Sequence, residues 1–143
     1  MEIPLITLNI YIFYLFENNH YRKKLFLLGA LIMLIYHIGY LTIWGNLYWI
    51  DVIGICFAML LLTIMAYFSL VRILEQDDQK VIKNILFWFT LASFIYYIGR
   101  IPITALTFGP INLDDEVFDK MYVINDVLYV FWYLTIAIGV TYT

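Results

Sequence analysis

Charged residues are scarce in this sequence. Asp, Glu, Lys and Arg make up only 13% of its 143 residues, whereas soluble domains hold about 25%. The 8 basic residues form no stripe and the formal net charge is −3, so nothing here suits a phosphate backbone and we expect no nucleic-acid partner. Cys56 is the single cysteine, which excludes an intrachain disulfide and any metal site built on cysteine pairs.

The sequence also lacks the common catalytic and cofactor patterns. Neither the HExxH zinc-protease pattern nor the GxSxG nucleophile elbow occurs. His37 is the one histidine inside an apolar run, which leaves a haem without a second histidine ligand. No lysine lies in the last apolar run to form a retinal Schiff base. We therefore expect no catalytic residue, no cofactor and no bound metal, and we expect that the protein is not an enzyme.

Apolar residues dominate what is present: 64% of the chain is hydrophobic, 20% is aromatic, and the mean hydropathy is +0.87. An α-helix needs about 20 apolar residues to cross a hydrocarbon layer of ~30 Å. The sequence predicts an all-α protein in which residues 1–143 form one polytopic transmembrane helical bundle of about five helices, the first of them short. The predicted spans are 3–16, 25–44, 47–71, 84–101 and 121–143.

The first run, 3–16, is short for a crossing and leaves two alternatives open. It either crosses the membrane, which we favour, or lies in the interface as a surface helix. Glu2 stands where a signal peptide has basic residues, and no small-residue cleavage site follows, so the run is not a typical signal peptide. Asn9, in the middle of the run, is tolerated if it faces other helices.

Basic residues are distributed unequally between the two sides of the predicted bundle. Arg100 and Lys120 lie on one side, and the other 6 flank the connectors after the first and third runs. Because Lys and Arg are enriched in cytoplasmic loops, we expect a multi-pass protein of the cell (inner or plasma) membrane, with its N-terminus outside and its C-terminus in the cytoplasm. The basic residues of the cytoplasmic side are Arg22, Lys23, Lys24, Arg72, Lys80 and Lys83.

Pro102 follows the fourth predicted span, which we extend at most to Leu106. Proline removes a backbone donor and disfavours helical geometry at the preceding residue, so we expect this helix to end or kink here. The segment 102–120 then forms a loop that begins apolar and ends acidic. It either caps the outer mouth of the bundle or is an ordinary amphipathic surface loop.

The outer half of the predicted bundle collects four ionisable residues from four spans: His37, Asp51, Arg100 and Asp126. Ionisable groups at this depth are costly and usually face the bundle interior, a partner or a water-filled cavity. One interpretation is an outward-facing polar pocket in which Arg100 pairs with Asp126 and His37 responds to pH. The alternative is structural pairing together with snorkelling of Arg100 to the headgroups. Polar groups at similar depths are Asn125, Tyr36, Tyr40, Tyr96 and Tyr97.

The later part of the chain has a recurring pattern: the aromatic-rich helix FWFTLASFIYYIGR, an acidic connector, and the segment DVLYVFWYLTIAIGV. In this pattern the chain resembles small multi-span membrane proteins and membrane sensor modules of Bacteroidota-like bacteria, from about Leu25 onward. The resemblance implies a bacterial protein and a sensing role, since some such modules precede or accompany histidine kinases. These 143 residues hold no kinase domain, so a sensor of this kind signals through a partner.

These observations favour an integral membrane sensor or accessory protein that acts through a partner membrane protein. The alternative is a subunit of a small oligomeric transporter or channel, which needs a continuous polar path that the apolar inner halves of the spans do not offer. A membrane-embedded enzyme is the least favoured class. The expected partners are the lipid bilayer and either another membrane protein or a second copy of the chain.

Overall fold

The structure, a computed structural model, describes residues 2–44, 52–75, 81–108 and 114–142. These residues form five α-helices, one short 3-10 turn and no strand, which confirms the all-α prediction. Four of the helices are long and apolar enough to cross a membrane, so the chain is a polytopic membrane protein. The elements are α1 (Glu2–Phe16), α2 (His20–Trp44), α3 (Val52–Glu75), η1 (Val81–Lys83), α4 (Ile85–Phe108) and α5 (Asp115–Tyr142).

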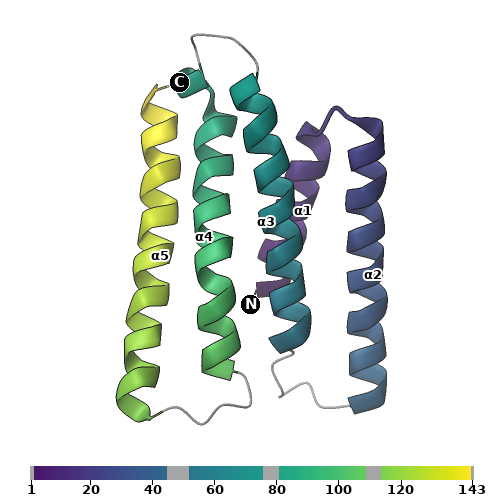
Figure 1. Ribbon diagram of the computed structural model, residues 1–143, viewed down its shortest axis with the longest axis vertical. Coiled ribbons are helices and arrows are strands. Elements are labelled where there is room, and N and C mark those ends of the chain that lie inside the picture. Colours follow the sequence, from purple (N-terminus) through teal and green to yellow (C-terminus); the bar gives the residue numbers. More distant parts are fainter. Residues whose placement is uncertain (1, 45–51, 76–80, 109–113, 143) are drawn as a thin grey trace.

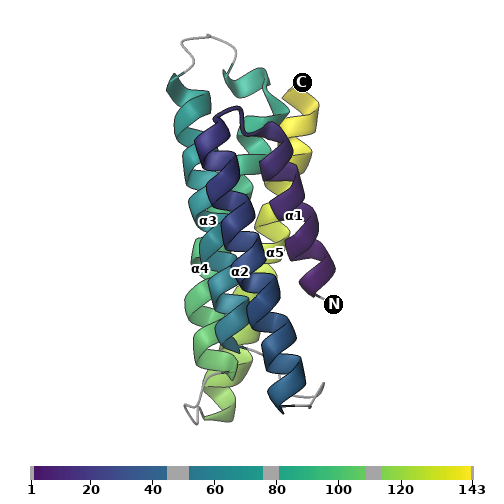
Figure 2. The ribbon, with the colours of Figure 1, turned by 90° about the vertical axis from the view of Figure 1, so that its right-hand side faces the viewer.

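The four long helices stand side by side in the order α5, α4, α3, α2, and they alternate in direction (Figure 1). The short helix α1 lies behind α3 in this view, and the view from the side separates it from the rest (Figure 2). The largest interfaces join α3 to α4 and α4 to α5, whereas α2 packs on α3 and α1. α4 is therefore the central helix, and its polar side chains meet neighbours on both sides.

The two ends of the bundle differ in charge. The end at the top of Figure 1 holds the starts of α2 and α4 and the ends of α1, α3 and α5, and we call it the basic end. Its described basic residues are Arg22, Lys23, Lys24, Arg72 and Lys83. At the opposite end α4 stops and α5 begins, and we call it the acidic end. Its described acidic residues are Asp114, Asp115, Glu116 and Asp119.

Three helices extend beyond their apolar runs. α2 begins at His20 because Asn19 caps it: the Oδ1 of Asn19 accepts hydrogen bonds from the backbone N–H groups of Tyr21 and Arg22, at 2.9 Å and 3.3 Å. α3 continues past the predicted end to Glu75. α5 begins six residues before the predicted 121, at Asp115, where acidic side chains in the first turn are stabilised by the helix dipole.

The predicted loop at 102–120 is wrong for most of its length. α4 runs through Pro102 to Phe108, and residues from 115 onward belong to α5. The continuation of α4 is held by packing: Ile103 and Thr104 are buried, and the Oγ1 of Thr104 lies 3.9 Å from the Sδ of Met59 on α3. Proline is tolerated in such helices because neighbouring helices support the chain around it.

α1 runs along the bundle, and its N-terminus lies short of the acidic end (Figures 1 and 2). Its 15 residues extend over about 22 Å at 1.5 Å per residue, less than the ~30 Å of a hydrocarbon layer. The face formed by Ile6, Asn9 and Phe13 is buried, so Asn9 faces other helices, which is the condition under which it is tolerated. α1 is therefore a packed helix of the bundle, shorter than its four neighbours.

Candidate functional site

Arg100 is a charged side chain buried inside the bundle, with 8% of its surface exposed. Its Nη1 donates hydrogen bonds to the hydroxyl of Tyr96, one turn earlier on α4, and to the hydroxyl of Tyr129 on α5 at 2.9 Å. Its Cζ lies 5.4 Å and 5.1 Å from the centroids of the same two rings, within the range of cation–π attraction. The two tyrosines therefore fix the guanidinium at the α4–α5 interface with both their hydroxyls and their ring faces.

A cavity of about 190 Å³ lies between α4 and α5, on the side of Arg100 that faces the acidic end. Arg100, Thr104 and Thr107 line it from α4, and Asn125 and Tyr129 line it from α5. The Oγ1 of Thr107 is buried and makes no hydrogen bond to any described group. The cavity therefore offers a cation, hydroxyls and an amide. Its less polar lining residues are Ile103, Phe108, Met121 and Tyr122.

Toward the basic end the same interface is closed. Trp132 packs on Tyr96 with ring centroids 5.9 Å apart, and its Nε1 donates to the Oγ of Ser93 at 3.4 Å. Farther along, α5 approaches α4 so closely that a Cβ on Gly139 would stand 2.4 Å from the Cβ of Trp88. Within the described residues the cavity is therefore blind, because no polar path continues from it between α4 and α5.

The structure brings only some of the predicted pocket residues to this cavity. Arg100 and Asn125 line it, and Tyr96 holds Arg100 from behind. Asp126 follows Asn125 on α5, but its side chain is exposed, lies outside the lining and forms no ion pair within the described residues. Consecutive residues of an α-helix point about 100° apart, so Asn125 and Asp126 cannot both face α4.

The remaining predicted residues lie elsewhere or are not described. His37 is half-buried on α2, which packs on α3 and α1 and stands on the far side of α3 from α5 (Figure 1). Tyr36 and Tyr40 stack on each other along the same helix, with ring centroids 6.4 Å apart. Asp51 lies outside the described residues. The described part of the four-residue cluster is thus divided among three helices, with Arg100 alone in the cavity.

Two adjacent tyrosines of α4, Tyr96 and Tyr97, make polar contacts on two different sides of this helix. The rings of Tyr96 and Tyr97 meet edge to face, with centroids 5.1 Å apart. Tyr96 faces α5, whereas the hydroxyl of Tyr97 accepts a hydrogen bond from the Nδ2 of Asn9 on α1, at 2.8 Å. Both Asn9 and Tyr97 are buried. α4 therefore connects α1 and α5 through polar side chains deep in the bundle.

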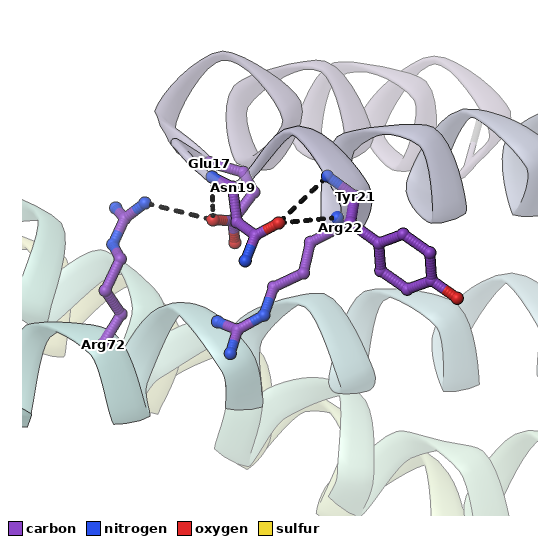
Figure 3. A network of polar contacts seen from close by, with 5 residues as sticks. All are labelled: Glu17, Asn19, Tyr21, Arg22 and Arg72. Atoms are coloured by element: carbon purple, nitrogen blue, oxygen red, sulfur yellow. Dashed lines mark hydrogen bonds and ion pairs between the residues drawn. The ribbon is translucent and has the colours of Figure 1, made fainter.

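A second polar cluster lies at the basic end (Figure 3). Glu17, directly after α1, is fully buried. Its Oε1 accepts from the backbone N–H of Asn19 at 2.9 Å and from the Nη1 of Arg72 at 3.4 Å. Since Asn19 also caps α2, this cluster ties α1, α2 and α3 together. A cavity beside it, lined by Arg72 and Ser69, measures about 10 Å³, roughly room for one water, so we interpret the cluster as structural.

Sequence reasoning missed Tyr129, Thr104 and Thr107 at the cavity. The two threonines were assigned to a loop, although with Arg100 they are spaced i, i+4 and i+7 on one helical face. Tyr129 likewise continues the face of Asn125, four residues later. Carrying the helical register through Pro102 would have found all three. The buried Glu17 had no such signal, because a carboxylate beside basic residues in a connector is usually solvated.

Comparison with known proteins assigns no family to the chain. No protein-family model matches it, and no curated protein or solved structure is significantly similar to it. The wall of the cavity carries one positive charge, that of Arg100, and its side chains can both donate and accept hydrogen bonds. These are the properties of a binding site for a small polar ligand.

Proposed function

We propose that this chain is an integral membrane sensor or accessory protein, which binds a ligand between α4 and α5 and acts through a second membrane protein. The observation that carries the proposal is the blind shape of the cavity. Its polar wall centres on Arg100, and toward the basic end it is closed by Trp132 and by the approach of Gly139 to Trp88. A site of this form takes up a ligand from one side and offers no route through the α4–α5 interface.

α5 is the element through which the ligand would act. It packs on α4, and much of its remaining surface is exposed, including Val127, Val130 and Leu134. A ligand between two helices shifts their arrangement by as much as its affinity differs between the two arrangements. In the proposed mechanism, the resulting displacement of α5 changes the face that a partner helix contacts.

The charge asymmetry supports an orientation for this mechanism. In our proposal the basic end lies in the cytoplasm of a bacterium and the acidic end faces the outside of the cell membrane. The cavity then lies in the outer half of the bilayer. The ligand arrives from outside or from the outer leaflet, and the partner is contacted within the membrane.

Site-specific photo-crosslinking in the cell that makes the protein tests this proposal. A photoreactive amino acid at Val127 or Leu134, which are 61% and 58% exposed, is expected to crosslink one membrane protein reproducibly. The same group at Leu31 on α2, which is 52% exposed, is the matched control and is expected to give lipid adducts. Filling the cavity by Asn125→Leu is expected to change the crosslinking yield from α5 and leave the yield from α2 unchanged.

Two results would contradict the proposal. One is crosslinking from α5 and α2 to the same assortment of proteins, which would indicate random collision in the membrane. The other is solute or ion flux through liposomes that contain the purified chain alone. That outcome would favour the alternative of an oligomeric transporter or channel subunit, because an accessory protein with a blind cavity has no transport activity of its own.

A further inference from the structure

We propose that the start of α2, at the basic end of the bundle, binds the headgroup of an anionic phospholipid. Arg22, Lys23 and Lys24 are consecutive near the beginning of this helix, and the apolar run of α2 begins at Leu25. At 1.5 Å per residue, the three cations lie within about 5 Å of the hydrocarbon edge, which is the level of the lipid headgroups. This surface lies apart from the α4–α5 cavity, and the inference does not depend on the proposed function.

The three cations have no carboxylate partner among the described residues. Glu17, the described carboxylate nearest to them in the sequence, is occupied by the guanidinium of Arg72 and by the backbone N–H of Asn19 (Figure 3). α2 also has no acidic residue in its first turn, where cations are disfavoured by the positive end of the helix dipole. A bound anion therefore offsets an unfavourable concentration of positive charge.

Aromatic rings of two other helices hold two of the cations in place. The Cζ of Arg22 lies 4.8 Å from the ring centroid of Phe68 on α3, and the Nζ of Lys23 lies 5.3 Å from that of Tyr14 on α1. Both distances are within the range of cation–π attraction. A general preference for basic residues in cytoplasmic loops would not require contacts with two neighbouring helices. The contacts instead preorganise positive charge for the oxygens of a phosphate.

An exposed apolar track continues along α2 from the cations. Lys24 is exposed, and Leu28, Leu31 and Ile35 follow it at i+4, i+7 and i+11, so they share its face of the helix and are exposed as well. Only 6% of the most apolar stretch of α2 is buried in the structure, against 44% for α3. One phospholipid can therefore place its phosphate beside the cations and an acyl chain along the track, which adds contacts to a helix that has few in the bundle.

Native mass spectrometry of the purified full-length chain measures this binding. Phosphatidylglycerol is compared with phosphatidylcholine of the same acyl chains, so that the two probes differ in headgroup charge. We expect preferential retention of phosphatidylglycerol. We also expect phosphatidylglycerol, added to detergent micelles, to raise the midpoint of thermal unfolding more than phosphatidylcholine does, because a ligand that binds the folded state stabilises it.

Variants of Lys24 locate the binding. Lys24 is exposed, so its replacement is expected to leave the fold intact. Each basic residue near an anionic membrane surface strengthens the attraction by about fivefold, and Lys24→Gln is expected to lower the affinity for phosphatidylglycerol by about that factor. The double variant Lys23→Gln/Lys24→Gln is expected to lower it by about tenfold or more. Lys24→Arg keeps the charge and is expected to bind as the wild type does.

Two exposed cations elsewhere are matched controls. Lys83 lies at the same end of the bundle, on η1, which packs on α4 and α5. α3 separates α2 from α4 (Figure 1), and packed helices lie about 8–10 Å apart, so Lys83 is beyond the screening length of about 8 Å. Lys120 lies at the acidic end. Lys83→Gln and Lys120→Gln are each expected to change the affinity by less than about twofold.

The proposal is overturned if the wild-type chain retains the two lipids equally, or if Lys24→Gln binds phosphatidylglycerol as tightly as the wild type. An equal loss in Lys83→Gln would indicate attraction by the basic end as a whole and would overturn it too. A loss in Lys24→Arg as large as that in Lys24→Gln would show that charge is not the cause, with the same consequence. Crosslinking from α5 tests the proposed function separately, because it concerns a different face of the bundle.

Discussion

Replacing Gly139 with alanine tests how closely α4 and α5 must approach each other. An added Cβ at this position would stand 2.4 Å from the Cβ and 2.7 Å from the Cγ of Trp88, whereas non-bonded carbons prefer about 3.5–4.0 Å. Trp88 has little freedom to move away. Its Cβ is attached to the backbone of α4, its Nε1 donates to the carbonyl oxygen of Ile82 at 2.7 Å, and its ring stacks on Tyr142.

Two opposing effects set the size of the change. Overpacking of a close-packed interface costs about 1–3 kcal/mol, and an overlap with a backbone-anchored atom puts Gly139→Ala near the upper limit. Alanine recovers about 1 kcal/mol of helix propensity relative to glycine. We therefore expect Gly139→Ala to lower the free energy of unfolding by about 2 kcal/mol.

Other glycines provide matched controls on the same chain. A Cβ on Gly39 of α2 meets no described atom within 4 Å, so Gly39→Ala is expected to raise the free energy of unfolding by up to about 1 kcal/mol. A Cβ on Gly29 would meet the Cδ1 of Leu61 at 2.9 Å, but this atom is the movable end of a side chain. Gly29→Ala is therefore expected to fall between the other two variants.

Far-UV circular dichroism during SDS titration in mixed micelles measures these differences. The refuting result is a Gly139→Ala variant as stable as the wild type, or a change equal in sign and size to that of Gly39→Ala. Either outcome would mean that α5 does not approach Trp88 as closely as the structure places it. The closed side of the cavity would then be lost as an argument against transport.

Three further changes probe other contacts. Glu17→Gln removes a fully buried charge and is expected to lower the free energy of unfolding, measured by chemical denaturation, by about 2 kcal/mol. Glu116→Gln, at an exposed ion pair, is the control and should change this free energy by less than about 0.5 kcal/mol. Equal effects of the two variants would contradict the burial of Glu17. A double-mutant cycle of Asn9→Leu and Tyr97→Phe is expected to show a coupling energy of about 0.6–1.7 kcal/mol, and zero coupling would contradict their hydrogen bond. Pro102→Ala restores a backbone donor inside α4 and is expected to slow amide exchange at residues 98–106 without loss of helicity; unchanged exchange would indicate a helix that ends at Pro102.

Much of the fold followed from the sequence because lipid imposes simple rules. Apolar runs of sufficient length with short connectors leave helices as the structure that satisfies every backbone hydrogen bond in a bilayer. The same rules did not predict where the helices begin and end. Arg22 and Glu116 lie in the first turns of α2 and α5, because a helix continues beyond the hydrocarbon where capping groups such as Asn19 allow it. Hydropathy marks the lipid-immersed part of a helix and does not mark its cap.

The site was harder to predict because two local rules conflicted. The known effects of proline on helices led us to expect an end or a kink at Pro102 and a loop over 102–120, so Thr104 and Thr107 were not considered as site residues. In the bundle, the burial of Ile103 and Thr104, with Thr104 against Met59 of α3, outweighs the lost donor. Depth alone also grouped Arg100 with Asp126, although depth says nothing of rotation about the helix axis. Asp126 is exposed, whereas Asn125 is half-buried. The two differ because consecutive residues of a helix point about 100° apart.

The rotation of α4 about its own axis could have been predicted from its polar residues rather than from its apolar ones. A helix surrounded by lipid and by other helices is apolar on every side, so its hydrophobic periodicity is weak. Most buried polar positions on α4 instead recur with heptad spacing, at Thr90, Ser93, Tyr97, Arg100 and Thr104, and Tyr96 lies beside this series. That spacing marks the face of a central helix, since polar groups at membrane depth need partners from neighbouring helices. Arg100 belongs to this stripe, and the partner that it finds on a neighbouring helix is Tyr129 of α5.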